Sequence, residues 1–393
     1  MSRPPFPSGW SSIPLNPRNL TLANTLPVGQ SFLWHRHSLP SASQSTPSEE
    51  FSRAVDDPPR VVCLRQSPSH LYYTAIHCDE LAAKIDREKG STRRWLDDYF
   101  QFQAQPDLEA LYAEWKVRDP ALFGKVEVDG RAIGVRVLRQ DPWECLIAFI
   151  TSTNNHIPRI TSLLHRFSEA FSPPILNLEH PSGHGSTTHH LFPAPHLIPS
   201  KLESILREMG FGYRASFIES SLESLRAEFG SKPGNIEAGL MTWRAMDVDL
   251  GVGRKVADCV MLMCLDKPSL IPIDTHLTAI AARHPSFPLR LRNKPMSKLI
   301  YDETQEFLLD KWGPLGGWCQ AVMFAADLPQ AQVKVKKEKI VVTQKASTPV
   351  KRPLENDFIT NTELKRTRSA TRLHVKRSTT VNVKEEEIHV KIE

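Results

Sequence analysis

The 393-residue chain is long enough for about two or three domain-sized units and for a substantial buried core. It contains no run of 18 apolar residues and no apolar secretory segment at its start, so we expect no membrane association. Its net charge of +5 is uneven: residues 331–393 carry 15 Lys and Arg against 8 Asp and Glu, whereas the other 330 residues carry 34 against 36. Any polyanion bound there would need a local patch and backbone amides.

The six cysteines are scattered and form no Cys-x-x-Cys pair. This spacing excludes a zinc knuckle and a four-cysteine iron–sulfur loop. We therefore expect free thiols in a reducing compartment.

An antiparallel sheet is predicted between about Trp10 and Thr74. Residues 1–9 are rich in proline and are expected to be loose, and residues 37–59, rich in Ser, Pro and charge, are expected to form a long loop. Short β-type runs flank this loop at residues 20–22, 31–34, 60–64 and 71–74.

Helices are expected to dominate after about residue 90. Asp141-Pro142-Trp143-Glu144 has the cap, proline and acid of a helix start, and a buried helix is expected to follow over residues 145–150. Residues 173–200 contain five histidines whose spacing matches no zinc pattern, and they are expected to form a solvated loop. Further helices are expected over residues 202–226, with a break at 210–214, and over 240–283, 299–312 and 316–327. The fold class is therefore α+β.

The stretch Gly251-Val252-Gly253 opens a predicted helix whose first turn contains Lys255. Glycines allow a tight turn and a close backbone approach, and the N–H groups of a helix start suit a phosphate. Asp274 follows 19 residues later, at the expected start of the next helix, where it could serve as an N-cap. An amine attacks only when it is neutral, a state that a helix start and partial burial both favour. On the residues alone, Lys255 could instead bind phosphate and Asp274 could be only a cap.

These motifs resemble those of the helix-hairpin-helix DNA glycosylase superfamily and, within it, the 8-oxoguanine DNA glycosylases of a eukaryotic, fungal type. The similarity runs from about Trp10 to Gln330. It implies a TBP-like antiparallel sheet subdomain over 10–110, followed by a two-part helical glycosylase domain over 111–330 with the hairpin motif at about 240–266. It also implies Lys255 as the catalytic nucleophile and Asp274 as the carboxylate that supports charge at the sugar C1′.

The same resemblance implies a pocket for a base flipped out of the duplex. Cys259, one helical turn after Lys255, would pack one face of the base, and Phe324 would pack the other. Gln320 would read the Watson–Crick edge, and the Gly29 carbonyl would accept the N7–H that distinguishes 8-oxoguanine from guanine. Without the resemblance, Gly29 is a turn glycine and the other three are ordinary helix residues.

The resemblance also implies a DNA-contacting set that comprises Asn154, Arg159, Tyr213, Arg214, Gly251, Gly253, Val256 and His276. In it, Asn154 and Arg159 would occupy the space of the flipped base and contact the orphaned cytosine. Tyr213 would act as a wedge, Arg214 would read the cytosine and His276 would contact phosphate. Each could otherwise be an ordinary surface residue. His156, Pro158 and Asp249-Leu250 depart from the family pattern.

The implied activity is that of a bifunctional DNA glycosylase/AP lyase, which removes 8-oxoguanine opposite cytosine through a Schiff base and then nicks the strand by β-elimination. No redox cofactor or catalytic metal is implied, although the hairpin carbonyls could hold a structural cation. A monofunctional or alkyl-base glycosylase is an alternative that Lys255 disfavours. A non-catalytic DNA-binding adaptor is another, which would need no complete base pocket. We expect a monomer.

Residues 331–393 are expected to be a disordered basic tail. Lys351-Arg352 and, twelve residues later, Lys365-Arg366-Thr367-Arg368 fit a bipartite nuclear-import pattern. Three Val-Lys-x-Glu stretches containing Lys336, Lys384 and Lys391 resemble SUMO acceptors, so import factors and the SUMO machinery are candidate partners. The first acidic residue is Glu49, which leaves a mitochondrial pool open beside the favoured nuclear location.

Overall fold

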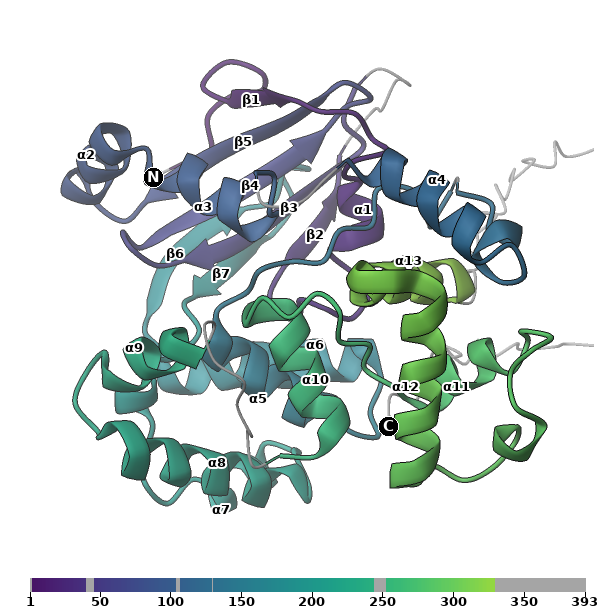
Figure 1. Cartoon of the computed structure of the whole chain (residues 1–393). Helices are drawn as coiled ribbons and strands as arrows, with labels where there is room; N and C mark the ends of the chain where they lie inside the picture. Colours follow the sequence, from purple (N-terminus) through teal and green to yellow (C-terminus); the bar gives the residue numbers. More distant parts are fainter. Residues whose placement is uncertain (1, 40–45, 104–106, 129, 244–251, 329–393) are drawn as a thin grey trace, which may run out of the picture. The chain divides into compact units, whose positions relative to one another are not determined.

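The computed structural model describes residues 2–39, 46–103, 107–128, 130–243 and 252–328 (Figure 1). Its strands are β1 (Ser11–Pro14), β2 (His35–Ser38), β3 (Glu49–Val55), β4 (Arg60–Gln66), β5 (His70–His77), β6 (Pro174–Glu179) and β7 (Ser186–His190). Its first helices are α1 (Leu22–Thr25), α2 (Glu80–Lys89), α3 (Ser91–Tyr99), α4 (Leu108–Arg118), α5 (Pro142–Ser152) and α6 (Ile157–Phe171). The later helices are α7 (Glu203–Glu208), α8 (Arg214–Phe229), α9 (Asn235–Thr242), α10 (Arg254–Cys264), α11 (Thr275–Ala281), α12 (Lys298–Trp312) and α13 (Gly316–Asp327).

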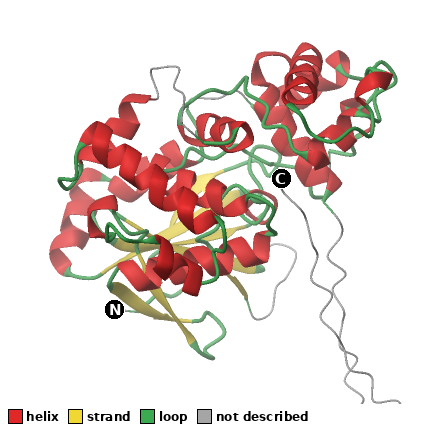
Figure 2. Ribbon diagram, turned by 90° about the horizontal axis from the view of Figure 1, so that it is seen from below, coloured by secondary structure: helices red, strands yellow, loops and turns green. Residues whose placement is uncertain are grey.

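The predicted antiparallel sheet and the helical region after it are confirmed. Five strands pair in the order β1-β5-β4-β3-β2, and every pairing is antiparallel. The strands lie in the upper part of Figure 1, and α5 to α10 lie below them. Seen from below, helices lie in front of part of the strands (Figure 2). The predicted tail lies outside the described residues, and no described helix is both long and apolar enough to cross a bilayer.

Strand β4 is buried on both faces. Val62 and Leu64 contribute to the core shared with Leu96 and Phe100 near the end of α3. The alternate residues Val61 and Cys63 pack instead with Leu178 of β6. This arrangement explains why residues 60–64 form an almost continuous apolar run, since both faces of the strand need apolar side chains.

The expected loop over residues 37–59 is wrong, because it contains β3. Strand β3 carries charged residues, but their charges are paired rather than solvated. Glu50 accepts a hydrogen bond from Arg65 at 2.8 Å, and the guanidinium of Arg53 donates to Glu144 at 2.7 Å. Residues 20–22 and 31–34, expected to be β-type, are also not strands: α1 begins at Leu22, and β2 begins only at His35.

The first residues of the chain make specific contacts, which differs from the expected loose N-terminus. Arg3 Nε lies 2.7 Å from Glu50, and the Phe6 ring packs edge-on against Tyr72 with centroids 5.0 Å apart. The Arg65 guanidinium lies 4.9 Å from the centroid of the same Phe6 ring. This proline-rich segment is therefore packed against strands β3, β4 and β5.

The histidine-rich segment is not a solvated loop, because β6 and β7 form a hairpin within it. His189 is buried, and its Nε2 lies 3.1 Å from Ser52 Oγ of β3. Two further histidines complete the contact: the His35 ring lies 4.3 Å from that of His165 and 5.0 Å from that of His189, centroid to centroid. Within the described part of the chain, no group of three or more His, Cys, Asp or Glu is arranged to hold a metal ion.

The predicted helix starts and breaks are confirmed. Asp141 caps α5 by accepting the N–H of Glu144 at 2.9 Å, with Pro142 in the first turn. Every residue of α5 is buried, and the helix packs against α6, α8, α9 and α10. The break predicted at 210–214 separates α7 from α8, and α12 and α13 begin within one residue of their expected positions.

Candidate active site

Helix α10 begins directly after the glycine hairpin. Gly253 occupies its N-cap position, and no side chain caps the first turn. No described residue lies within 4 Å of a Cβ built on Gly253, so none of them blocks the first N–H groups of the helix. The side chain of Val256 is buried, so its predicted contact with DNA would use its backbone N–H. Gly251 and the departure at Asp249-Leu250 lie outside the described residues.

Lys255 projects from the first turn of α10 toward the end of α5. Its Nζ lies 3.5 Å from Ser152 Oγ and 5.2 Å from the centroid of the Phe149 ring. The amine is half-buried, and the described residues place a hydroxyl and an aromatic face next to it but no paired carboxylate.

Asp274 is buried and caps α11, as predicted. Its Oδ1 accepts the Leu277 N–H at 2.7 Å. Burial raises the pKa of the Asp274 carboxyl, and the nearby charge of Lys255 opposes this rise. The amine and the carboxylate predicted to act together therefore influence each other electrostatically.

One cavity, here called the Lys255 cavity, brings together all six residues predicted for catalysis and base recognition. Its walls come from α5, α10, α13, the start of α11 and the turn after α1. The predicted residues that line it are Gly29, Lys255, Cys259, Asp274, Gln320 and Phe324. It has an amine, a carboxylate, an amide, a thiol and an aromatic ring, and can therefore combine nucleophilic chemistry with the reading of a flat, polar ligand.

Three features of the lining bear on ligand recognition. Burial raises the pKa of the Cys259 thiol to about 12, so this thiol is neutral and is a packing group rather than a nucleophile. The Oε1 atom of Gln320 is buried and accepts no hydrogen bond from any described residue, so it is available as an acceptor. Gly29 has a φ of +84°, a conformation that favours glycine and orients its peptide in the turn.

Sequence reasoning missed other lining residues: Val28, Gln30, Phe149, Met263, Pro272 and Ala321. Phe149 was assigned to a buried helix, and this is correct. However, the helical pattern cannot distinguish a core position from a cavity wall. Only the proximity of Lys255 in space reveals the second role of Phe149.

The residues predicted to face the opposite strand form a second group at the end of α5. Arg214 Nε donates to the Thr153 carbonyl at 2.8 Å, and its Nη2 donates to the Asn154 carbonyl at 2.7 Å. Tyr213 Oη donates to the same Thr153 carbonyl at 3.2 Å, and its side chain is 44% exposed. Arg159 donates to the Gly210 carbonyl at 3.1 Å. Tyr213 and Arg159 are therefore accessible, whereas Arg214 is buried and uses its donors within the protein.

Two departures from the family pattern are accommodated at the start of α6. His156 occupies the N-cap position, where its Nδ1 accepts the Arg159 N–H at 3.4 Å. Pro158 lies in the first turn, where a proline costs no helical hydrogen bond. The unusual residues therefore keep a helix start directly beside Asn154, whose φ of +45° turns the chain there.

His276 lies at the edge of the Lys255 cavity region. Its ring packs edge-on against Phe324, with centroids 5.1 Å apart, and its Nε2 lies 3.2 Å from Asp327 without hydrogen-bond alignment. Asp327 also pairs with Arg283 at 2.8 Å. His276 is thus placed beside a residue predicted to pack on the base. Its contact with phosphate stays a prediction, as does a structural cation at the hairpin.

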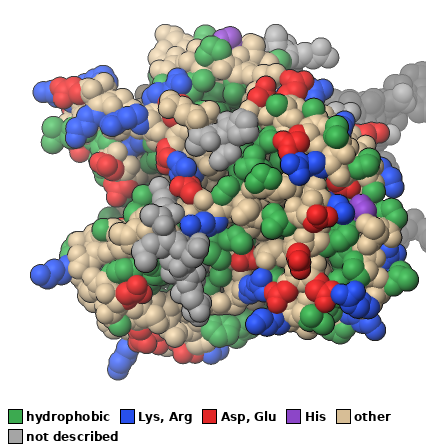
Figure 3. Space-filling model, in the orientation of Figure 1, with side chains coloured by type: hydrophobic (Ala, Val, Ile, Leu, Met, Phe, Trp, Pro, Cys, Tyr) green, Lys and Arg blue, Asp and Glu red, His purple; other side chains and the backbone are tan. Residues whose placement is uncertain are grey.

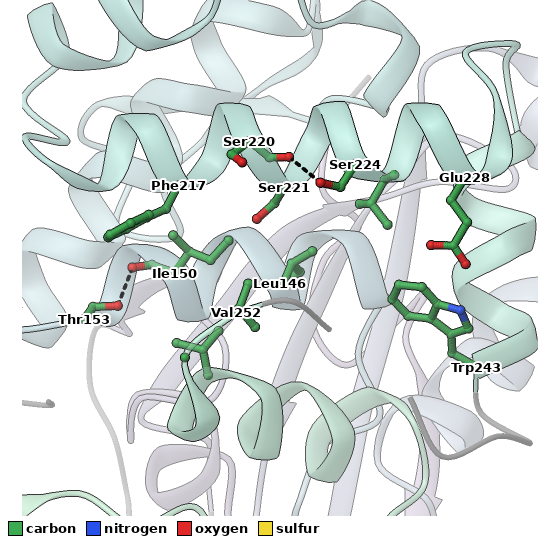
Figure 4. Close-up of a pocket in the computed structure, with 13 residues that line it drawn as sticks. Leu146, Ile150, Thr153, Phe217, Ser220, Ser221, Ser224, Glu228, Trp243 and Val252 are labelled. Atoms are coloured by element: carbon green, nitrogen blue, oxygen red, sulfur yellow. Dashed lines mark hydrogen bonds between the residues drawn. The ribbon is translucent and has the colours of Figure 1, made fainter. Parts of the chain in front are cut away.

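A larger cavity of about 410 Å³ lies between α5, α8 and α10. In Figure 4, Phe217 and Ser221 of α8 lie across from Ile150 and Leu146 of α5, with Val252 below them. Its walls contain one ionisable side chain, Glu228, and no amine among the described residues. The larger cavity therefore lacks the paired groups that the Lys255 cavity has.

Figure 3 shows acidic and basic side chains interspersed on one face of the molecule, without a single large basic field. This agrees with the near-balanced charge of the first 330 residues. Binding of a polyanion would thus depend on local groups such as the uncapped start of α10.

Comparisons with known proteins find relatives among the N-glycosylase/DNA lyases. Residues 12–146 match the family described as 8-oxoguanine DNA glycosylase, N-terminal domain. The chain is 32% identical over 332 residues to N-glycosylase/DNA lyase OGG1 of Arabidopsis thaliana, an alignment that covers 81% of this chain and 80% of that protein. It is 28% identical over 352 residues to the N-glycosylase/DNA lyase of Saccharomyces cerevisiae, covering 81% of this chain and 86% of the yeast protein.

Solved structures share the fold. The structure of MBOgg1 in complex with a low-affinity DNA ligand is 22% identical, with a TM-score of 0.60, and the match covers 81% of this chain and 95% of that chain. The Clostridium acetobutylicum 8-oxoguanine glycosylase/lyase, in complex with double-stranded DNA containing cytosine opposite 8-oxoguanine, is 24% identical with a TM-score of 0.57. That match covers 78% of this chain and 91% of the bacterial chain. The sheet and the helical region therefore form a known arrangement.

Proposed function

The chain belongs to the OGG1-type 8-oxoguanine DNA glycosylase/lyase family, and from this premise we propose that it excises 8-oxoguanine paired with cytosine in duplex DNA and then cleaves the strand, with Lys255 as the nucleophile. The observation that carries the proposal is the Lys255 cavity. It joins an amine, a buried carboxylate and an unpartnered amide oxygen in one place.

In the proposed reaction, the target nucleotide leaves the duplex and its base enters the Lys255 cavity. The neutral amine of Lys255 attacks C1′, so a C1′–N bond forms as the bond from C1′ to the base breaks. Asp274, buried beside Lys255, stabilises the positive charge that develops on the sugar. Opening of the sugar ring gives a Schiff base. Loss of a C2′ proton then expels the 3′ phosphate and nicks the strand.

The proposed recognition of the base uses the cavity walls. Cys259, a neutral and buried thiol, would pack against one face of the base and Phe324 against the other. The free Oε1 of Gln320 would accept from the Watson–Crick edge, and the Gly29 carbonyl would accept the N7–H of 8-oxoguanine. Guanine lacks this N7–H and would leave the carbonyl unpaired, which is the basis of the proposed discrimination.

The opposite strand would meet the group at the end of α5. Tyr213 is exposed beside Asn154 and Arg159, and is suited to occupy the space that the flipped nucleotide vacates. Arg214 would reach the cytosine only if it released the carbonyls of Thr153 and Asn154. We therefore assign the first cytosine contact to Arg159.

Borohydride trapping tests the nucleophile and the substrate together. The wild type and Lys255→Gln are incubated with a duplex containing 8-oxoguanine opposite cytosine and then reduced. We expect a covalent protein–DNA adduct with the wild type and none with Lys255→Gln. Lys298→Gln is the matched control, because Lys298 is an exposed lysine that also begins a helix.

The alternatives predict different products. Release of free base by the wild type without an adduct would indicate a monofunctional glycosylase. Tight binding with neither an adduct nor base release would indicate an adaptor, and either result would overturn the proposed chemistry. The six groups that meet around the Lys255 cavity argue against an adaptor, because DNA binding alone needs no such set.

A further inference from the structure

A buried carboxylate lies on the same helix as Lys255 but outside the Lys255 cavity. Asp258 follows Lys255 by three residues on α10, and its side chain is only 3% exposed. Burial raises the pKa of its carboxyl, and hydrogen bonds from Tyr301 and Gln305 oppose this rise. A buried carboxylate is costly unless donors satisfy it, so these two residues of α12 stabilise its placement.

Tyr301 connects Asp258 to the segment that leads to Asp274. Its Oη donates to Asp258 Oδ2 at 2.6 Å and accepts the Ile273 N–H at 3.1 Å. These directions are unambiguous, because the hydroxyl has one proton and the backbone N–H can only donate. Ile273 immediately precedes Asp274. One hydroxyl therefore joins the helix of the amine to the segment of the carboxylate.

Gln305 makes the same connection one turn further along α12. Its Nε2 donates to Asp258 Oδ2 at 2.7 Å and to the Ile271 carbonyl at 3.0 Å. Its Oε1 accepts from Arg254 Nη2 at 2.9 Å. Arg254 precedes Lys255 in the chain, pairs with Asp302 of α12, and lies 4.5 Å from the Tyr301 ring centroid. The residues on both sides of Lys255 along α10 are thus held by α12.

We propose that Tyr301 and Gln305 are positioning residues, which set the separation of the Lys255 amine and the Asp274 carboxylate by bridging Asp258 to the backbone of Ile271 and Ile273. No described residue of α12 lines the Lys255 cavity, so this bridge acts through α10 and the 271–273 segment and touches no substrate. A small displacement of catalytic groups lowers the reaction rate steeply. The inference rests on the proposed function.

The test measures the rate of base release in a single turnover, with a duplex containing 8-oxoguanine opposite cytosine. Protein is in excess, and its active fraction is first titrated with a duplex that contains an uncleavable abasic analogue. Tyr301→Phe removes the hydroxyl and keeps the ring, and we expect the rate constant to fall at least tenfold. The Kd for the abasic-analogue duplex is expected to stay within twofold of the wild-type value. Gln305→Met, which keeps the length of the side chain, is expected to lower the rate in the same way and carries the test if Tyr301→Phe does not fold.

Thr304→Val is the matched control. Thr304 lies on α12 between the two positioning residues, is fully buried, and its hydroxyl has no hydrogen-bond partner among the described residues. The rate constant for base release by Thr304→Val is expected to match that of the wild type. Equal rates in all four proteins, or an equal loss in Thr304→Val, would overturn the positioning role, since α12 would then act only through general packing. If the wild type itself releases no base, the proposed function fails instead.

Discussion

At the scale of single residues, Asp274 combines two tasks that substitution can separate. Its carboxylate caps α11 through the Leu277 N–H, and it shares the Lys255 cavity with the amine. An asparagine at this position keeps an oxygen that can accept the capping hydrogen bond but has no charge. An alanine loses both properties.

We expect Asp274→Asn to lower the single-turnover rate of base release by about 10²- to 10³-fold, the typical effect of removing one electrostatic group from a transition state. Its unfolding free energy is expected to stay close to the wild-type value. Asp274→Ala is expected to lose the same activity and, in addition, about 1 kcal/mol of unfolding free energy, as is usual for a lost helix cap. Urea denaturation and base-release assays on both variants give the comparison. A wild-type rate in Asp274→Asn would mean that Asp274 serves only as a cap.

Some of the residue-level predictions came from the local sequence pattern, and others came only from the resemblance to a family. The cap at Asp274 follows from its place between an apolar run and a helix, and the structure confirms it. The roles assigned to Cys259, Gln320 and Phe324 came from the resemblance alone, and the structure places all three at one cavity. Tyr301 and Gln305 carried no signal in the sequence, because their partners Asp258 and Ile273 are distant along the chain.

At the scale of elements, local signals predicted helices well and strands less well. Asp141 and Pro142 mark the start of α5 in the sequence because a cap acts within a few residues. Strand β3 escaped prediction because its charged residues are stabilised by partners outside the strand: Arg65 for Glu50, and Glu144 of α5 for Arg53. Such pairing depends on the tertiary fold, and no local pattern reports it.

The cap of α5 can be tested by substitution, because Asp141 precedes the buried helix and accepts an N–H from its first turn. Asp141→Ala removes the acceptor of the Glu144 N–H and is expected to lower the unfolding free energy by about 1 kcal/mol. Asp141→Asn keeps an acceptor and is expected to stay within a few tenths of a kcal/mol of the wild type. Thermal denaturation at neutral pH measures both. An equal loss in the two variants would show that the charge of Asp141, rather than its cap, stabilises α5.

At the scale of the whole molecule, a separate hairpin from far along the chain packs against the five-stranded sheet. Leu178 of the β6–β7 hairpin packs on Val61, Cys63 and Ile76, more than 100 residues earlier. The histidines that suggested a solvated loop form part of this contact. His189 is buried against Ser52, and its ring lies close to that of His35. The composition of residues 173–200 indicated a polar segment correctly. It could not show that a histidine of this segment would be hydrogen-bonded to a residue of the sheet.

This junction makes stability depend on pH. Burial lowers the pKa of His189 from 6.5 to about 4. The unfolded chain therefore binds a proton between these values while the folded chain does not, so the contribution of His189 to stability falls as the pH decreases from 6.5 toward 4. The full difference corresponds to about 3 to 4 kcal/mol of unfolding free energy, at about 1.4 kcal/mol per pKa unit.

His189→Gln keeps a neutral, hydrogen-bonding side chain that does not titrate. We expect its unfolding free energy, measured by urea denaturation at several values of pH, to fall less steeply than that of the wild type between pH 6.5 and pH 4. The stability of this variant still depends on pH through His35 and His165. Burial lowers the pKa of His35 to about 2 and that of His165 to about 4. His184→Gln, at an exposed position between β6 and β7, is the matched control and is expected to follow the wild type. Parallel curves for the wild type and His189→Gln would mean that the hairpin accommodates a charged His189 without loss, and that acid sensitivity arises elsewhere in the fold.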